Sequence, residues 1–156
     1  MKKLLKIFIA FLLIAFVIMQ FFQPKKNISK ITENHILEKK DIPKNIESIL
    51  KNACLDCHSN QTNYLWYHNI SPVSWMVNKH VVAGKSELNL SDWGELDLFG
   101  KIAVLDDICT EVEHKRMPLK EYTLMHKEAK LSDEQIAELC AWTEKMGLKI
   151  LASIEN

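Results

Sequence analysis

The sequence contains few residues that interrupt helices, and its charge is not biased toward either sign. Of its 156 residues only four are glycine and four are proline, and residues that favour helices dominate. This composition argues against an all-β fold and against disorder. The 20 basic and 20 acidic residues give a formal net charge of zero. Because a nucleic-acid-binding domain carries a basic excess, we expect no nucleic acid among the partners.

The chain also lacks an alternating strand pattern, an internal repeat and a second Cys-x-x-Cys motif. It does contain apolar residues at helical spacing, which predict an all-α fold. A Ser-x-x-Gln capping box marks the start of the last helix especially clearly. Four helices are predicted. The first begins near Asp41 and runs into Cys54, and the second extends from Ser71 to Gly84. The third extends from Leu96 to His114, and the fourth from Ser132 to Gly147.

The segment Cys54-Leu55-Asp56-Cys57-His58 matches C-x-x-C-H, the attachment motif of a c-type haem. Each thiol can form a thioether with a haem vinyl group, and the histidine can ligate the iron. A dithiol redox pair is an alternative, but it belongs in a βαβ context that this chain lacks. A zinc site is a second alternative, and it would have to recruit scattered ligands. We therefore predict one covalent haem c on Cys54 and Cys57, with His58 as an iron ligand.

The first 24 residues are typical of an export signal. Three lysines among the first six residues precede an apolar run from Ile7 to Phe22. Bulky residues end this run where a signal peptidase requires small ones, so we expect an uncleaved membrane anchor, with a removed signal peptide as the alternative. Haem is attached to c-type proteins outside the cytoplasm. We therefore predict a transmembrane segment over 1–24, a polar tether over 25–40, and a haem-binding domain over 41–156 that faces the periplasm from the inner membrane.

The sixth iron ligand is predicted to be Met117. This methionine precedes Pro118 in a turn-like stretch between two predicted helices, where its sulfur can approach an iron without disturbing a helix. His80 is the strongest rival, and an open or water-bound position is a third possibility. Met76 and Met146 lie on apolar helix stripes, so we expect them in the core. Ligation by His58 and Met117 would raise the reduction potential and suit an electron carrier.

Two further cysteines and two histidines have weaker predictions. Cys109 and Cys140 fall within apolar helical patterns, which predicts buried free thiols, with a disulfide as the alternative. His114 and His126 flank the Met117 loop, and we expect both side chains to be solvated, with an approach to the haem propionates as the alternative.

An aromatic-rich stretch follows the C-x-x-C-H motif. Trp66 and Tyr67 would either line the edge of a haem or wall a small core. Asn60 or Thr62 would either bond the haem propionates or cap a turn.

Several segments, taken in order, resemble the family of small bacterial haem-binding domain proteins. The resemblance covers roughly residues 44–142. It rests on the stretch from His58 to Trp75, on Gly84, on Leu88-Asn89-Leu90-Ser91-Asp92-Trp93, on Met117-Pro118-Leu119, and on Tyr122, His126 and Glu128-Ala129-Lys130-Leu131-Ser132.

This resemblance implies an exported, often membrane-anchored protein with a cytochrome c-like domain and a single covalent haem. It implies attachment through Cys54 and Cys57, with His58 as the proximal ligand. Met117 matches the Met-Pro-Leu position of the family and is the implied distal ligand. The chain departs from the family at Leu65, where a proline is common, and at His68, where a small polar residue is usual.

Together these patterns predict a monohaem c-type cytochrome domain that transfers one electron at a time to or from redox partner proteins. We expect no enzymatic activity. A haem-based sensor or a peroxidase-like protein is the alternative, and it requires an open sixth iron position. A structural metal-binding module without haem is a third.

Overall fold

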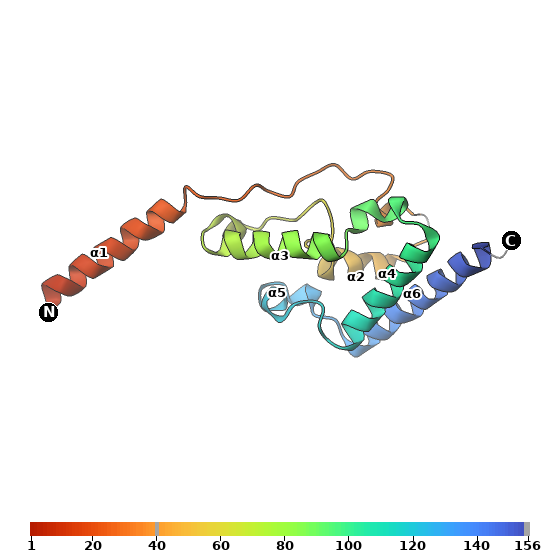
Figure 1. Cartoon of the computed structure of the whole chain (residues 1–156). Helices are drawn as coiled ribbons and strands as arrows, with labels where there is room; N and C mark the ends of the chain where they lie inside the picture. Colours follow the sequence, from red (N-terminus) through yellow and green to blue (C-terminus); the bar gives the residue numbers. More distant parts are fainter. Residues whose placement is uncertain (40, 155–156) are drawn as a thin grey trace.

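The computed structural model describes residues 1–39 and 41–154, and every regular element within these ranges is a helix (Figure 1). The predicted all-α class is therefore confirmed. Lys40, the last residue of the predicted tether, and residues 155–156, the end of the predicted domain, lie outside these ranges. The α-helices are α1 (Lys2–Met19), α2 (Lys44–Ala53), α3 (Val73–Glu87), α4 (Leu98–Glu113), α5 (Lys120–Met125) and α6 (Asp133–Ile154); the short 3-10 helices are η1 (Ile36–Glu38), η2 (Trp66–Asn69), η3 (Leu90–Glu95) and η4 (Lys127–Ala129).

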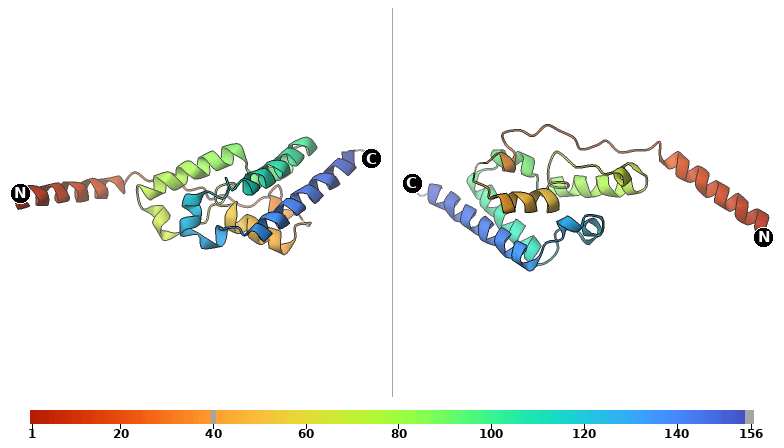
Figure 2. Two further views of the ribbon diagram at one scale, coloured as in Figure 1. Left: turned by 90° about the horizontal axis from the view of Figure 1, so that it is seen from below. Right: turned by 180° about the vertical axis from the view of Figure 1, so that it is seen from behind.

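The hydrophobic core lies where α2 packs against a pair of helices, α4 and α6. These two helices run side by side in opposite directions in all three views (Figures 1 and 2). The predicted capping box forms at the start of α6, because Gln135 donates its backbone N–H to Ser132 Oγ and accepts from the Ser132 backbone. The buried apolar side chains are Ile36, Ile46, Ile49, Leu50, Leu55, Leu90, Trp93, Leu105, Ile108, Val112, Leu139 and Trp142.

Two helices extend past the glycines at which they were predicted to end. α3 continues through Gly84 to Glu87, and α6 continues through Gly147 to Ile154. Neither glycine has a positive φ, so neither forms a helix-terminating turn. The two glycines differ in their surroundings: a Cβ on Gly84 would meet another segment, whereas a Cβ on Gly147 would have no atom within 4 Å.

A disulfide joins Cys109 of α4 to Cys140 of α6. The expectation of two buried free thiols is therefore wrong, and the alternative holds. The two residues are 31 positions apart in sequence, and only the packing of α4 on α6 brings them together. The bond fixes the helix pair that forms one wall of the core.

Removing this disulfide should lower the free energy of unfolding by about 2–4 kcal/mol, since the cross-link restricts the unfolded chain. We expect the double variant C109A/C140A to remain folded but to unfold at a lower urea concentration. Wild-type protein treated with a reductant should match the variant. Equal unfolding midpoints for oxidised wild type and variant would contradict the bond.

The segment before α2 packs on the domain. The backbone N–H of Thr62 donates to Asn27 O at 2.9 Å, and Asn27 Nδ2 donates to Ser59 O at 2.8 Å. Farther along, His35 and Ile36 are buried, and Ile36 belongs to the core. The sequence around them is polar, so no periodic apolar stripe marked these contacts.

Burial lowers the pKa of His35, and the nearby Glu38 carboxylate opposes this only in part. Because the folded pKa is below the unfolded value of about 6.5, His35 stabilises the fold fully above that pH and loses this contribution as pH falls. We expect the urea midpoint to decline from pH 7 toward pH 5. The variant His35→Asn keeps an acceptor for the backbone N–H of Leu37 and should show a shallower decline. The control is His114→Gln, because His114 is exposed and its replacement should leave the pH dependence of the urea midpoint unchanged. If His35→Asn also shows the wild-type pH dependence, the assignment to His35 is wrong.

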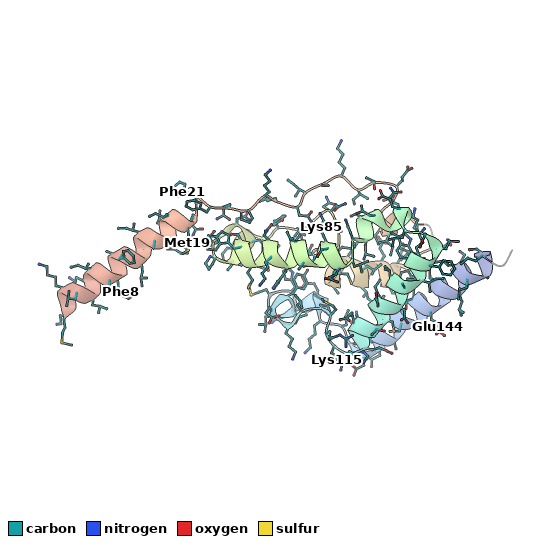
Figure 3. All side chains as sticks on the ribbon, in the orientation of Figure 1. Phe8, Met19, Phe21, Lys85, Lys115 and Glu144 are labelled. Atoms are coloured by element: carbon teal, nitrogen blue, oxygen red, sulfur yellow. A yellow bond between two sulfur atoms is a disulfide. The ribbon has the colours of Figure 1, made fainter. Side chains whose placement is uncertain are left out.

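The N-terminal helix α1 carries apolar side chains that are exposed on every face. Their exposed fractions run from 42% at Phe16 to 72% at Leu4, and none of the helix is buried. Phe8 stands clear of the rest of the chain (Figure 3). Among the described residues no helix has both the length and the apolar character needed to cross a membrane. The helical form of this segment is as expected, but the prediction that it spans a membrane has no support here.

Candidate functional site

The C-x-x-C-H motif forms a tight turn at the C-terminal end of α2. The backbone N–H groups of Cys54 and Leu55 both donate to Leu50 O at 3.0 Å, and His58 N donates to Cys54 O at 2.9 Å. Leu55 packs into the core, and Cys54 is partly buried against it. The core therefore anchors the turn, while Cys54, Cys57 and His58 line a common cavity.

Helix α3 packs directly on this turn at Gly84. A Cβ built on Gly84 would lie 2.9 Å from Cys57 O and 3.1 Å from Cys57 Cβ. These atoms belong to rigid parts of the turn, so only glycine permits this approach. Gly84 was expected to end a helix, and its role is instead to let α3 contact the motif.

His58 is held by the segment that follows α3. Its Nδ1 lies 3.1 Å from Leu88 O, and its own carbonyl accepts from the backbone N–H of Leu90 at 2.8 Å. A ligand histidine commonly donates one ring nitrogen to a backbone carbonyl, which fixes the ring and leaves the other nitrogen for the metal. His58 has this arrangement, with Nε2 as the available nitrogen.

Three adjoining cavities surround the motif, and we name them by position. The central cavity, of about 250 Å³, is lined by Cys54, Cys57, His58, His80 and Met117, among others. An outer cavity of about 460 Å³ shares Cys54, His58 and Met117 with it and extends toward α4. A side cavity of about 230 Å³ shares Cys57 and His80 with the central one and extends toward η2 and α5. The central cavity thus brings all four predicted site residues to one space.

Burial raises the pKa of both motif thiols. The pKa of Cys54 rises to about 12, with the neighbouring Cys57 adding to the effect, and that of Cys57 rises to about 11, with Asp56 contributing. Both thiols therefore stay protonated at neutral pH. A reactive dithiol has the opposite property, a depressed pKa, so this environment disfavours the redox-pair alternative.

The zinc alternative also finds no ligand set at the motif. Within residues 1–39 and 41–154, the one group of three or more closely spaced ligand atoms is that of Cys109, Glu113 and Cys140. Its two sulfurs are bonded to each other.

Asp56, between the two cysteines, connects the motif to α5. Its Oδ1 accepts from the backbone N–H of Asn63 at 2.9 Å, and its Oδ2 accepts from the Tyr122 hydroxyl at 2.8 Å. The Tyr122 ring stacks on His126, with 4.0 Å between centroids, and Tyr67 Oη lies 2.8 Å from His126 Nε2. This chain of contacts holds η2 and α5 against the motif.

Sequence reasoning missed this network. His126 was expected to be solvated, but the residue is only 4% exposed, and both Tyr122 and His68 stack with its ring. The available signal was the i, i+4 spacing of Tyr122 and His126, which places both on one face of a helical turn. His68 is also buried, and burial together with the nearby His126 lowers its pKa.

Other candidate residues lie away from the central cavity. Trp66 is 74% exposed, whereas Tyr67 lines the side cavity. Thr62 Oγ1 donates to Asp56 O at 2.6 Å, so it braces the motif turn. Asn60 bonds Asp92 and Asn89 and joins the turn to η3.

The two methionines expected in the core differ from each other. Met146 packs partly buried against the core, whereas Met76 lies at the surface and lines the side cavity. Met117 is itself partly buried against the core, and it lines the central cavity together with the motif.

Two protonated thiols, an imidazole oriented through its Nδ1 and a thioether all face one apolar cavity. This donor set fits a haem of the c type. The combined volume of the central and outer cavities lies within the range of about 300–1,000 Å³ that is usual for cofactor pockets. The site thus defines the chain as a haem protein by its chemistry.

Residues 14–145 match the haem-binding domain family. This match covers most of the chain, so the protein belongs to that family, as its motifs indicated, and haem binding follows. Comparison with curated proteins and with solved structures gave no match.

Proposed function

We propose that this protein carries one haem joined to Cys54 and Cys57 by thioethers, with His58 and Met117 as axial ligands, and that it transfers single electrons. The observation that carries this proposal is the common exposure of these four side chains to the central cavity. When bound, the haem supplies an iron that alternates between ferric and ferrous states.

The chain's own residues set the properties of that iron. Leu88 O orients His58 through Nδ1, and the Met117 thioether favours the ferrous state, which raises the reduction potential. With His58 and Met117 both as ligands, a bound haem iron would have no position open to oxygen or peroxide. The tight turn at the motif and the packing of Gly84 on Cys57 keep the site rigid, which suits electron transfer.

We also propose that the domain faces the periplasm at the inner membrane. A c-type haem is attached outside the cytoplasm, and the Cys109–Cys140 bond is typical of an oxidising compartment. The lysines that precede the apolar residues of α1 are typical of an exported chain. A lipid surface is the partner that suits the exposed apolar side chains of α1.

The experiment is a redox titration of the protein matured with a c-type haem assembly system. We expect one reversible one-electron transition and no rapid binding of carbon monoxide by the ferrous protein. Rapid carbon monoxide binding would show an open sixth position and would replace electron transfer with sensing or peroxidase-like chemistry. In that case the proposal that redox proteins are its partners would fail as well.

A further inference from the structure

The side cavity lies beside the haem site but contacts neither predicted iron ligand. Its walls include Cys57, His80 and Tyr122, which also line the central cavity, whereas His58 and Met117 line only the other two cavities. A molecule in the side cavity would therefore be next to a haem attached at Cys57 without competing for its iron.

The size and lining of this cavity fit one substituted aromatic ring. An apolar cavity of about 150 Å³ holds benzene, and the side cavity measures about 230 Å³. Most of its lining is apolar and comes from one face of α3 and from α5; these side chains are Val73, Met76, Val77, Val81 and Met125.

A hydrogen-bonded pair of buried His126 and half-buried Tyr67 forms one polar part of the wall. Tyr67 Oη lies 2.8 Å from His126 Nε2, and His126 Nδ1 lies 3.6 Å from a carboxylate oxygen of Glu128. Burial raises the pKa of Tyr67, so its hydroxyl keeps its proton at neutral pH. When the Tyr67 oxygen accepts a proton, its own hydroxyl proton can pass to His126 Nε2. Glu128 is exposed and lies beside His126 Nδ1, on the solvent side of the pair.

The cavity opens at an apolar edge of the domain next to α1. Met76 is 47% exposed and Met125 is 60% exposed at its rim. Trp75, beside Met76, donates its indole N–H to Phe22 O at 2.6 Å, which joins this edge to the segment that follows α1. Figure 3 labels Phe21, just past the end of α1, close to the start of α3. A ligand dissolved in lipid would reach the cavity from this edge.

We propose that the side cavity binds a lipid-soluble hydroquinone, which is the electron donor to the haem. This inference rests on the proposed function, since the haem is the oxidant. Oxidation of one hydroquinone to the quinone breaks two O–H bonds and releases two electrons and two protons. Each electron reduces one ferric iron to ferrous, so two oxidised haems, in two copies of the protein, balance one hydroquinone. The protons leave through Tyr67 and His126.

Binding can be tested without electron transfer, by titrating the oxidised haem protein with decylubiquinone in a calorimeter. We expect saturable binding to one site per chain. The variant Val77→Trp, which fills the cavity, should weaken this binding about tenfold or more. Val82→Trp is the matched control, because Val82 lies on the same helix but is 59% exposed and does not line the cavity. Absence of wild-type binding, or equal binding by Val77→Trp, overturns the proposal.

Electron transfer is then measured by mixing oxidised protein with decylubiquinol and following haem reduction. We expect two haems reduced per hydroquinone oxidised. Tyr67→Phe and His126→Gln should slow this reaction about 10²-fold, as expected for loss of a positioned proton acceptor, while reduction by ascorbate keeps its wild-type rate. Unchanged rates in both variants contradict the relay.

The controls distinguish failure of the haem assignment from failure of the hydroquinone proposal. If ascorbate fails to reduce the haem, the proposed function fails, while the calorimetric titration of the oxidised protein still decides whether the cavity takes a quinone. If ascorbate reduces the haem normally and decylubiquinol does not, the haem assignment stands and the hydroquinone proposal is wrong.

Discussion

Replacement of Met117 by leucine should remove the sulfur ligand and leave the fold intact. Leucine keeps a similar volume, so the partial packing of this position against the core is retained. We expect the ferric protein to lose the weak far-red absorption band of sulfur-ligated haem. The reduction potential should fall by on the order of a tenth of a volt or more, within the range of about 0.8 V that axial ligands control. The ferrous variant should bind carbon monoxide.

The matched control is Met125→Leu, since Met125 lines the side cavity and not the central one. It should keep the wild-type band and potential. If Met117→Leu also keeps them, Met117 is not the ligand. His80→Ala then becomes the decisive variant, because His80 lines the same central cavity.

Replacement of Gly84 by alanine should destabilise the domain by about 1–3 kcal/mol, the usual cost of overpacking. The added Cβ would lie 2.9 Å from Cys57 O, so α3 would have to move away from the motif. We therefore expect a lower urea midpoint and a lower yield of covalently attached haem, measured on the same preparation.

The control for helix propensity is Gly147→Ala in α6, where the new Cβ meets no atom within 4 Å. This change should stabilise the protein by about 0.5–1 kcal/mol, because alanine favours a helix over glycine. The two substitutions thus have opposite expected signs. A stabilising Gly84→Ala would show that the contact between α3 and the motif is not tight.

The sequence was sufficient to predict the helical class because periodic apolar residues and a capping box act locally. It predicted the start of α2, α4 and α6 within a few residues. It failed at Gly84 and Gly147, because a glycine inside a helix and a glycine that ends one look alike without the neighbouring segment. The cause at Gly84 is Cys57, which is distant in sequence.

The candidate site was predictable to the extent that it depends on short motifs. The C-x-x-C-H spacing and the Met-Pro-Leu stretch indicated the four side chains that the fold brings to the central cavity. The burial of His126 was not predicted, and the Cys109–Cys140 bond was only the second choice, because both depend on contacts between separate helices. The burial of Ile36 was not predictable either, because the sequence around it is polar and its packing partners in the core are distant in sequence.

The central claim is that a single haem is bonded covalently to Cys54 and Cys57, and the mass of the denatured protein tests it most directly. Protein produced with a c-type haem assembly system is unfolded in acid and its intact mass is measured. The account predicts the mass of the chain plus one haem, and the mass of the chain alone for the double variant C54S/C57S. Wild-type protein that loses its haem on unfolding would contradict it.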